Sequence, residues 1–412
     1  MMRWVIYGRA IVQSPRSIIR LCTSPQLKFV ILAVLLLSPI TCLNVEAALA
    51  RTPIKLQRSL RAQQQAQQRK LNEGSLIILG GFPGTPYFEQ VHDIAAALDG
   101  SDGLRLIAVD AGGGIGSLQD LMLLRGIDLA LVPANVLAYA DTTNSLGPGL
   151  RERLTYITQL YGEEIHILVG AGTSSVEDLR GKKIAVPPLD GNAEFTVRDL
   201  LRRLQIDAEV IKVAAPDAID EVRSGTLAAL VLMGGKPLRF LANLPKDGSL
   251  RLLALPSSQS WGDGYSPASL RPDDYPALIP DEQTIDTLSV SAVLVANNTA
   301  KSDESNRRIA KFVPAFFGAL SALTTPERHP KWGEVNVALA LTGWQRFPAA
   351  DQWIDRNLRE QTALVQRSFE EFLRVSNPPG SPALAPAERR RLFEEYLKWT
   401  RDSTGAPSHA RP

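Results

Sequence analysis

Short apolar runs alternate with helical segments from Gly74 onward, and this alternation constrains the fold more than any other feature of the chain. The runs read SLIIL, LRLIAV, IDLALV, IHILVG, KIAVP, EVIKV, AALVLM and RLLAL. Unbroken apolar strands of this kind are typical of sheets that helices cover on both faces. Between them, segments such as YFEQVHDIAAAL place apolar residues at helical spacing. The pattern predicts a doubly wound α/β fold with mostly parallel strands.

Two of the predicted strands are long enough to pass between lobes. The first is LTYITQLYGEEIHILVG, residues 154–170, and the second is DTLSVSAVLVANN, residues 286–298. The alternating stretch is also too long for one comfortable sheet. We therefore expect two lobes, joined by two crossing strands, with a cleft between them.

The chain becomes helical after residue 300. The segment DESNRRIAKFVPAFFGAL has apolar residues at helical spacing, with Pro314 expected to kink the helix. Two further helical segments follow, separated by the proline-rich SNPPGSPALAPA. In the first of them, Ile354, Leu358, Val365 and Phe372 share one face, so we expect that face to pack on the body.

The N-terminus has the pattern of an export signal. Basic residues precede the apolar run FVILAVLLL, and Ala48-Leu49-Ala50 fits the small-x-small cleavage pattern. We expect a periplasmic protein cleaved after Ala50, with an uncleaved membrane anchor as the open alternative. Residues 51–73 are basic and rich in glutamine, which favours a solvated tether.

Composition excludes several classes of function. Cys22 and Cys42 both lie in the first fifty residues, so the body has no thiolate for catalysis or metal binding. Those fifty residues hold five basic residues and one acidic residue, so the remainder has a formal net charge of −2, against +2 for the whole chain. A near-neutral body gives no electrostatic case for nucleic acid as a partner.

The glycine-rich segments do not match known catalytic or cofactor motifs. GGGIGS and GGFPG lack the spacing of a dinucleotide loop, and GGKP has proline where a phosphate-binding loop needs Ser or Thr. No G-x-S-x-G or H-E-x-x-H is present, and the four histidines are scattered. We therefore expect no enzyme activity, no cofactor and no metal site.

Three glycine-rich loops follow predicted strands and precede predicted helices, at 80–87, 112–117 and 187–194. Such loops lie at the carboxyl edge of the sheet, where open α/β folds bind ligands. The free N–H groups at the start of a helix attract an anion. A tight turn explains any one of these loops equally well. Together they indicate a cleft that surrounds a small anion from both lobes, with Ser117 facing a ligand carboxylate.

From about Ser75 to Phe347 the chain resembles the TAXI-type substrate-binding proteins of tripartite ATP-independent periplasmic (TRAP) transporters. The resemblance is carried by GGFPGTPYF, GIGSLQDLMLLRGIDLALVPANV, LYGEEIHILVGAGTSSVEDLRGKKIAVP, GGKPLRFL, DTLSVSAVLVANN and RHPKWGEVN followed by GWQRF. It implies an exported clamp with the two-lobed type II periplasmic-binding-protein fold, here with a C-terminal helical extension. It also implies a small carboxylate-containing ligand, delivered to a TRAP-type membrane permease.

The resemblance also implies site residues. Tyr87 matches the aromatic residue after the first glycine loop, Gly116 and Ser117 match a Gly-Ser pair, and Ala134 and Asn135 match the polar pair after the third strand. With the other loop glycines and their neighbours, the expected ligand-binding residues are Gly84, Thr85, Tyr87, Gly114, Gly116, Ser117, Ala134, Asn135, Asn192, Ala193 and Gly235.

One departure from the family pattern affects the expected ligand. Where the family usually has Gly-Ser-Gly-Thr before the third ligand-side helix, this chain has Asp190-Gly191-Asn192-Ala193. Two hydroxyl donors are missing and a carboxylate is present, which puts the usual anion contact in doubt.

The function expected from the sequence is solute capture for transport. The open alternative is an orphan sensory or adaptor binding protein that presents its ligand to a membrane receptor. The expected organisation is a signal peptide (1–50), a basic linker (51–73), lobe 1 (74–165), lobe 2 (166–286), a return to lobe 1 (287–350) and a helical extension (351–412).

Overall fold

The structure is a computed structural model that describes residues 54–98, 103–256, 260–298, 303–376 and 385–403. The chain divides into two compact units, Met1–Leu71 and Asn72–Pro412. The predicted signal peptide lies outside the described residues. Within the ranges given above, no helix is both long and apolar enough to cross a membrane.

The basic segment that we expected to be a tether forms a helix, α2 (Ile54–Glu73). It contains neither glycine nor proline, and Gln, Arg, Ala and Leu are all good helix formers. Its side chains from residue 56 to residue 72 are exposed. The segment is therefore an exposed helix, and its role as a tether stays a prediction.

Lobe 1 begins with three strands that alternate with helices. The strands pair in parallel, with β1 between β2 and β3. The elements are β1 (Ser75–Leu79), α3 (Pro86–Leu98), β2 (Arg105–Val109), α4 (Gly114–Leu123), β3 (Leu129–Pro133), α5 (Ala134–Thr143) and the short α6 (Leu150–Arg153).

Lobe 2 repeats this arrangement. Strand β5 pairs in parallel with β6 and β7, and β7 pairs antiparallel with β4. The elements are η2 (Val176–Leu179), β5 (Lys183–Val186), α7 (Gly191–Leu204), β6 (Glu209–Lys212), α8 (Ala215–Ser224), β7 (Ala229–Gly234), α9 (Arg239–Ala242), β8 (Leu250–Leu252) and β9 (Ser266–Leu270).

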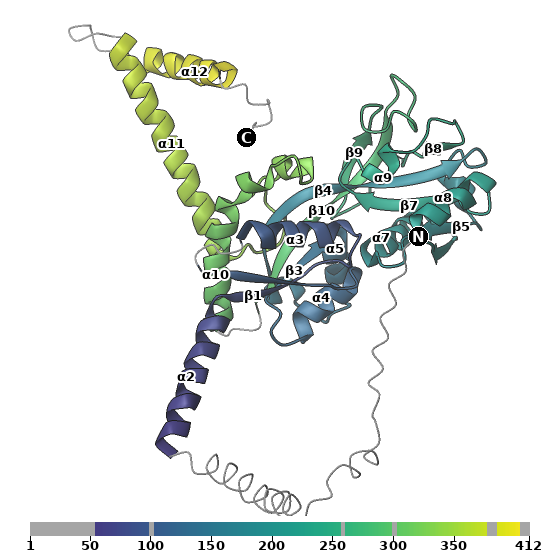
Figure 1. Cartoon of the computed structure of the whole chain (residues 1–412). Helices are drawn as coiled ribbons and strands as arrows, with labels where there is room; N and C mark the ends of the chain where they lie inside the picture. The colour runs from purple at the N-terminus through teal and green to yellow at the C-terminus, as the bar shows by residue number, and fades with distance from the viewer. Residues whose placement is uncertain (1–53, 99–102, 257–259, 299–302, 377–384, 404–412) are drawn as a thin grey trace, which may run out of the picture. The chain divides into compact units, whose positions relative to one another are not determined.

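Two long strands are shared by the lobes, as the sequence predicted. They are β4 (Leu154–Gly170) and β10 (Ile285–Asn297), which run antiparallel side by side in Figure 1. The first half of β4 pairs with β10 and its second half pairs with β7 and β8, while β10 pairs with both β3 and β9. The sheet order is β2-β1-β3-β10-β4-β7-β5-β6. This is the predicted two-lobed type II periplasmic-binding-protein fold.

A C-terminal helical extension completes the fold. After β10 come α10 (Asp303–Gly318), η3 (Leu320–Leu323), η4 (Pro330–Glu334), α11 (Pro348–Ser376) and α12 (Pro386–Ser403). Helix α10 includes Pro314 and buries Phe312 and Phe316 in the lobe 1 core, against α3 and the sheet.

The predicted packing of α11 is wrong for most of the face that we named. Only Ile354 joins the lobe 1 core, together with the neighbouring Trp353. Leu358 is 52% exposed and Phe372 is 38% exposed, because the helix continues beyond the body. Farther along, Phe369 packs instead on Phe393 and Tyr396 of α12. The apolar stripe therefore serves a helix pair as well as the body.

Candidate ligand-binding site

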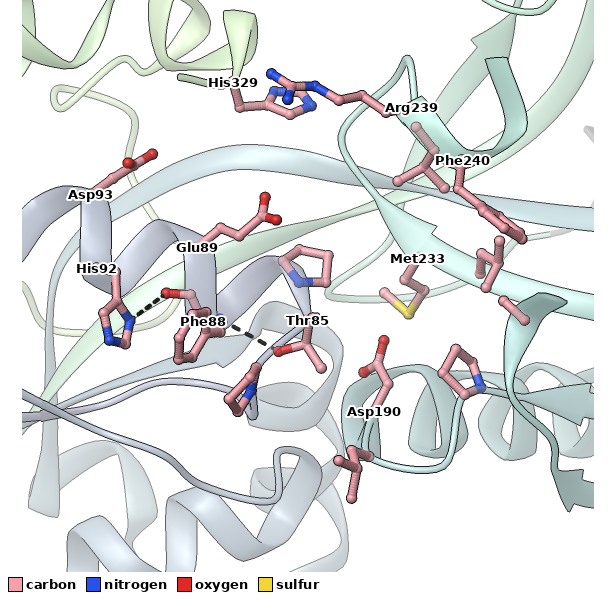
Figure 2. A pocket seen from close by; sticks show the side chains of 18 of the residues that line it. Thr85, Phe88, Glu89, His92, Asp93, Asp190, Met233, Arg239, Phe240 and His329 are labelled. Carbon is pink, nitrogen blue, oxygen red and sulfur yellow. Dashed lines mark hydrogen bonds between the residues drawn. The ribbon is translucent and has the colours of Figure 1, made fainter. Parts of the chain in front are cut away.

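A cavity of about 820 Å³ lies between the lobes, where several parallel strands end. Lobe 1 lines it with residues 83–86 of the loop after β1 and the start of α3, with Phe88, Glu89, His92 and Asp93 of α3, and with residues 327–329. Lobe 2 lines it with the loops that follow β5, β6 and β7. Figure 2 shows Thr85, Asp190 and Met233 around the same space. The cavity therefore occupies the edge at which open α/β folds bind ligands.

The lobes touch directly at the loop after β2. The Gly114 amide donates a 2.6 Å hydrogen bond to Asn192 Oδ1 of lobe 2. A Cβ added at Gly191 would lie 2.0 Å from the Gly112 carbonyl oxygen, and a Cβ at Gly113 would lie 2.8 Å from Asn192 Oδ1. The backbones approach so closely here that only glycine fits.

Asn135 makes a second contact between the lobes. Its Nδ2 donates to Thr196 Oγ1 at 2.9 Å and to the Tyr265 hydroxyl at 3.0 Å. The Tyr265 hydroxyl donates in turn to Asp199 Oδ2 at 2.8 Å. Although burial opposes ionisation, hydrogen bonds from Arg203 and Arg202 lower the pKa of Asp199 below its usual range. The network carries its ion pairs on the lobe 2 side, whereas Asn135 Oδ1 on the lobe 1 side is buried and has no described hydrogen-bond partner.

Asp190 caps the helix whose N-terminus was the expected anion site. Its Oδ1 accepts a hydrogen bond from the Ala193 amide at 2.9 Å, as an N-cap residue does. The residue is buried at 8% exposure but lines the cavity, and Figure 2 shows its carboxylate directed into that space. Burial raises the pKa of Asp190. The start of α7 is therefore occupied by a carboxylate of the chain itself.

A second buried carboxyl group, Glu163 of β4, lies near Asp190. Gln90 Nε2 of α3 donates to Glu163 Oε1 at 2.7 Å. Burial and then the charge of Asp190 raise the pKa of Glu163 well above its usual range. Burial, Glu163 and Asp190 likewise raise the pKa of Tyr87. These groups come from α3, from β4 and from the N-cap of α7. We call them the acidic cluster: Tyr87, Gln90, Glu163 and Asp190.

The next residue of β4, Glu164, connects the lobes at the crossing strands. Its Oε1 accepts from Lys331 Nζ at 2.6 Å, and its Oε2 accepts from the Lys236 amide at 2.9 Å. Lys331 and Glu164 are each only 4% exposed. His329 Nε2 donates to the Gly235 carbonyl at 3.0 Å, which ties the same two segments together. Burial lowers the pKa of His329.

The rim of the cavity carries both signs of charge. Arg328 lies 3.6 Å from Asp93, with which it forms an ion pair. Arg239 is exposed and, among the residues that the structure describes, forms no ion pair. Figure 2 shows it next to His329. Nearby, α8 begins at Ala215 with no side chain capping its first turn, and both Ala214 and Ala215 line the cavity. Arg239 and α8 are thus available to an anion.

Two of the predicted site residues, Gly84 and Thr85, line the cavity. Three others, Gly114, Asn135 and Asn192, make the direct contacts between lobes. The remaining six do not line the cavity. Tyr87, Ala134 and Ala193 are buried, Gly116 is exposed, Gly235 packs against His329, and Ser117 is 1% exposed with its Oγ accepting a hydrogen bond from the Gly113 amide.

Sequence reasoning missed Gln90, Glu163, Arg239 and the Glu164–Lys331 pair. Gln90 and Glu163 gave a signal, because each is polar within an otherwise apolar helix face or strand. Lys331 gave none, since its partner is 167 residues away in sequence. Among the described residues, no group of three or more His, Cys, Asp or Glu side chains is arranged to hold a metal ion.

Comparison with solved structures finds several binding proteins at low sequence identity. A mutant of ArgBP from T. maritima is 16% identical, with a TM-score of 0.35, covering 62% of this chain and 94% of its own. A TctC solute binding protein from Polaromonas is 17% identical, with a TM-score of 0.35 and coverages of 60% and 88%. The amino acid ABC transporter substrate-binding protein AbpA from Streptococcus pneumoniae is 15% identical, with a TM-score of 0.33 and coverages of 61% and 98%.

Comparison with characterised protein sequences finds no match. A family model, described as the NMT1-like family, matches residues 78–325. That match begins within β1 and ends before η4. It includes every residue that lines the cavity except Glu327, Arg328 and His329. The chain therefore belongs to the NMT1-like family.

Proposed function

We propose that the protein is an extracytoplasmic solute-binding protein of the TAXI type, which captures a small organic acid between its lobes and delivers it to a TRAP-type permease. The observation that carries the proposal is the cavity of about 820 Å³, which both lobes line. Ligand pockets typically have volumes of about 300–1,000 Å³. A clamp whose lobes meet on one side and enclose such a space on the other is suited to ligand capture.

Two groups on the cavity wall can anchor the ligand's carboxylate. Arg239 supplies a guanidinium, which binds carboxylates through two parallel hydrogen bonds. The uncapped start of α8 supplies backbone N–H groups. We keep the eleven predicted residues as candidates, with Gly84 and Thr85 in the wall and Gly114, Asn135 and Asn192 acting through closure. The division into lobe 1 (74–165 and 287–350) and lobe 2 (166–286) is part of the same proposal.

Native mass spectrometry of protein purified from its own host tests the proposal. We expect a small acid to co-purify and to rebind after removal. Arg239→Gln should weaken its binding by about tenfold or more, since a charged hydrogen bond contributes roughly 1.5–3 kcal/mol. Arg359→Gln, on exposed α11 outside the cavity, is the matched control and should bind normally.

Uptake by vesicles that contain a TRAP-type permease tests the transport role. Added binding protein should make uptake of the bound acid possible. If the acid binds but the permease never responds, the sensory alternative replaces transport. A protein that binds no acid at all would contradict the proposed function itself.

A further inference from the structure

The acidic cluster behind the cavity contains no ion pair. Among the residues that the structure describes, neither Glu163 nor Asp190 has an ion-pair partner, and the side chain that donates a hydrogen bond to Glu163 is the neutral amide of Gln90. Lys331, the cation that acts on Glu163, is itself paired with Glu164. Burying a carboxylate without a cation is costly, so such groups are normally paired. The cluster is therefore electrostatically incomplete.

Two other polar atoms of the cluster lack hydrogen-bond partners. The Tyr87 hydroxyl and Gln90 Oε1 are fully buried, and no described group bonds to either atom. Tyr87 is 1% exposed and Gln90 is 0% exposed. Buried polar atoms nearly always have partners, and exceptions call for an explanation. Gln90 Oε1 can only accept, so it lacks a donor, and the Tyr87 hydroxyl lacks a partner of either kind, independently of the charge argument.

The cavity has room for that donor next to Asp190. Tyr87 lies between Pro86 and Phe88, which both line the cavity, and Asp190 lines it from lobe 2. The cations of the cavity wall lie elsewhere. Arg328 is paired with Asp93, and Arg239 lies beside His329, away from Asp190 in Figure 2.

We infer that the ligand carries a protonated amine, which binds the Asp190 carboxylate and places a positive charge in front of Glu163. This inference rests on the proposed function, since it assigns one group of the captured acid. Asp190 already caps α7 with its own carboxylate, so a ligand carboxylate would be repelled there, and an ammonium would be attracted. The acid group then belongs on the Arg239 side.

Binding of such a ligand should release a proton. Burial raises the pKa of both Glu163 and Asp190, and the charge of Asp190 raises the pKa of Glu163 further. The empty pair therefore retains a proton that an ammonium would displace. The titratable or charged groups that act on the pair are Tyr87, Tyr161, Lys331 and Glu164. A cation competes with the proton, so affinity should rise as pH increases through the raised pKa range.

Calorimetry with a matched panel tests the inference. The probes are unbranched ω-aminoalkanoates, α-amino acids, monoamines and dicarboxylates of equal chain length. The best aminoalkanoate or amino acid should bind more tightly than the dicarboxylate of its length. Titration in two buffers of different ionisation enthalpy should show release of roughly one proton per ligand.

Asp190→Asn is the central variant, because an amide retains the N-cap acceptor and removes the charge. It should weaken amine binding about tenfold to a hundredfold. Glu163→Gln should weaken it less and abolish most of the proton release. Glu360→Gln removes the same charge from an exposed residue of α11 outside the cavity, and it should leave both quantities unchanged.

The outcomes separate this inference from the proposed function. If dicarboxylates bind as tightly as amino compounds and Asp190→Asn binds normally, the amine site is wrong and acid capture stands. If monoamines bind as well as aminoalkanoates, the amine site stands and the acid group is wrong. If no probe in the panel binds, both are overturned. A folded Glu163→Gln protein with undiminished proton release would remove Glu163 from the site.

Discussion

The loops after β1 and β2 have similar sequences, but they have different roles in the cleft. Gly84, in the first loop, lines the cavity, and a Cβ added there would meet no atom within 4 Å. Gly113, in the second loop, lies against Asn192 of the other lobe. Both glycines have positive φ angles, 88° and 75°. The same backbone freedom therefore leaves space for a ligand in one loop and permits contact between the lobes in the other.

This contrast changes the role expected for the loop at 112–117, which the sequence placed in the wall of the anion site. In this structure that loop contacts lobe 2 through Gly114 and Asn192, and the loop at 80–87 lines the cavity. Substitutions on the two sides of the cleft separate these roles.

Lys331→Met should have the largest effect on stability. Lys331 and Glu164 form a buried pair at the crossing strands, with Nζ and Oε1 2.6 Å apart, and Glu164 also accepts the Lys236 amide of lobe 2. Removing one partner of a buried pair costs about 3–5 kcal/mol, and the free energy of unfolding should fall by that amount in urea titration. Glu334→Gln is the control: it removes the 62% exposed carboxylate that also pairs with Lys331, and it should lower the free energy of unfolding by less than about 0.5 kcal/mol. Equal losses in the two variants would contradict the assignment.

Asn135→Ala should weaken the contact that Asn135 makes with lobe 2 and lower the free energy of unfolding. It leaves Thr196 and the Tyr265 hydroxyl without their amide donor, and unsatisfied buried groups cost about 1–3 kcal/mol. Thr142→Ala, an exposed position on the same helix, is the control and should unfold as the native protein does. If Asn135→Ala is equally neutral, the network does not hold the lobes.

Gly191→Ala should reduce ligand affinity about tenfold, equivalent to roughly 1.4 kcal/mol. The added Cβ would lie 2.0 Å from the Gly112 carbonyl oxygen, so the loops must separate and the closed state becomes less populated. Small-angle X-ray scattering should show a larger radius of gyration with ligand present.

Gly116→Ala is the matched control for that variant. Its Cβ meets nothing within 4 Å, and alanine is the better helix residue. It should bind ligand normally and unfold at a slightly higher temperature. Normal binding by Gly191→Ala would show that loop contact is not needed for capture.

Ser117→Ala should have the smallest effect. The Ser117 hydroxyl is buried and accepts the Gly113 amide proton, so its loss should cost about 0.5–1.5 kcal/mol of stability and change Kd about twofold or less. Calorimetry and urea titration on the same samples measure both. A large rise in Kd at unchanged stability would show that the loop at 112–117 contacts the ligand.

The sequence predicted the fold well because its periodicity reports burial directly. The apolar runs at 154–170 and 286–298 match β4 and β10 to within one residue at each end. Periodicity does not report what covers an apolar stripe, which is why Leu358 and Phe372 were misplaced. Nor does it report pairing at long range, so Glu163 and Lys331 were missed, although both are buried and polar.

Strand β10 has a consequence for the order in which the protein can be assembled. It is the last of the described strands, yet it lies between β3 and β4 in the sheet. The strands β5 to β8 of lobe 2 all precede it in the chain. A chain emerging from its N-terminus therefore completes those strand pairs before lobe 1 acquires its central strand. Until residue 285 is available, β3 has an unpaired edge, and such edges are prone to aggregation. Lobe 1, whose strands begin the chain, therefore acquires its full set of strand pairs only after β5 to β8 of lobe 2 have been synthesised.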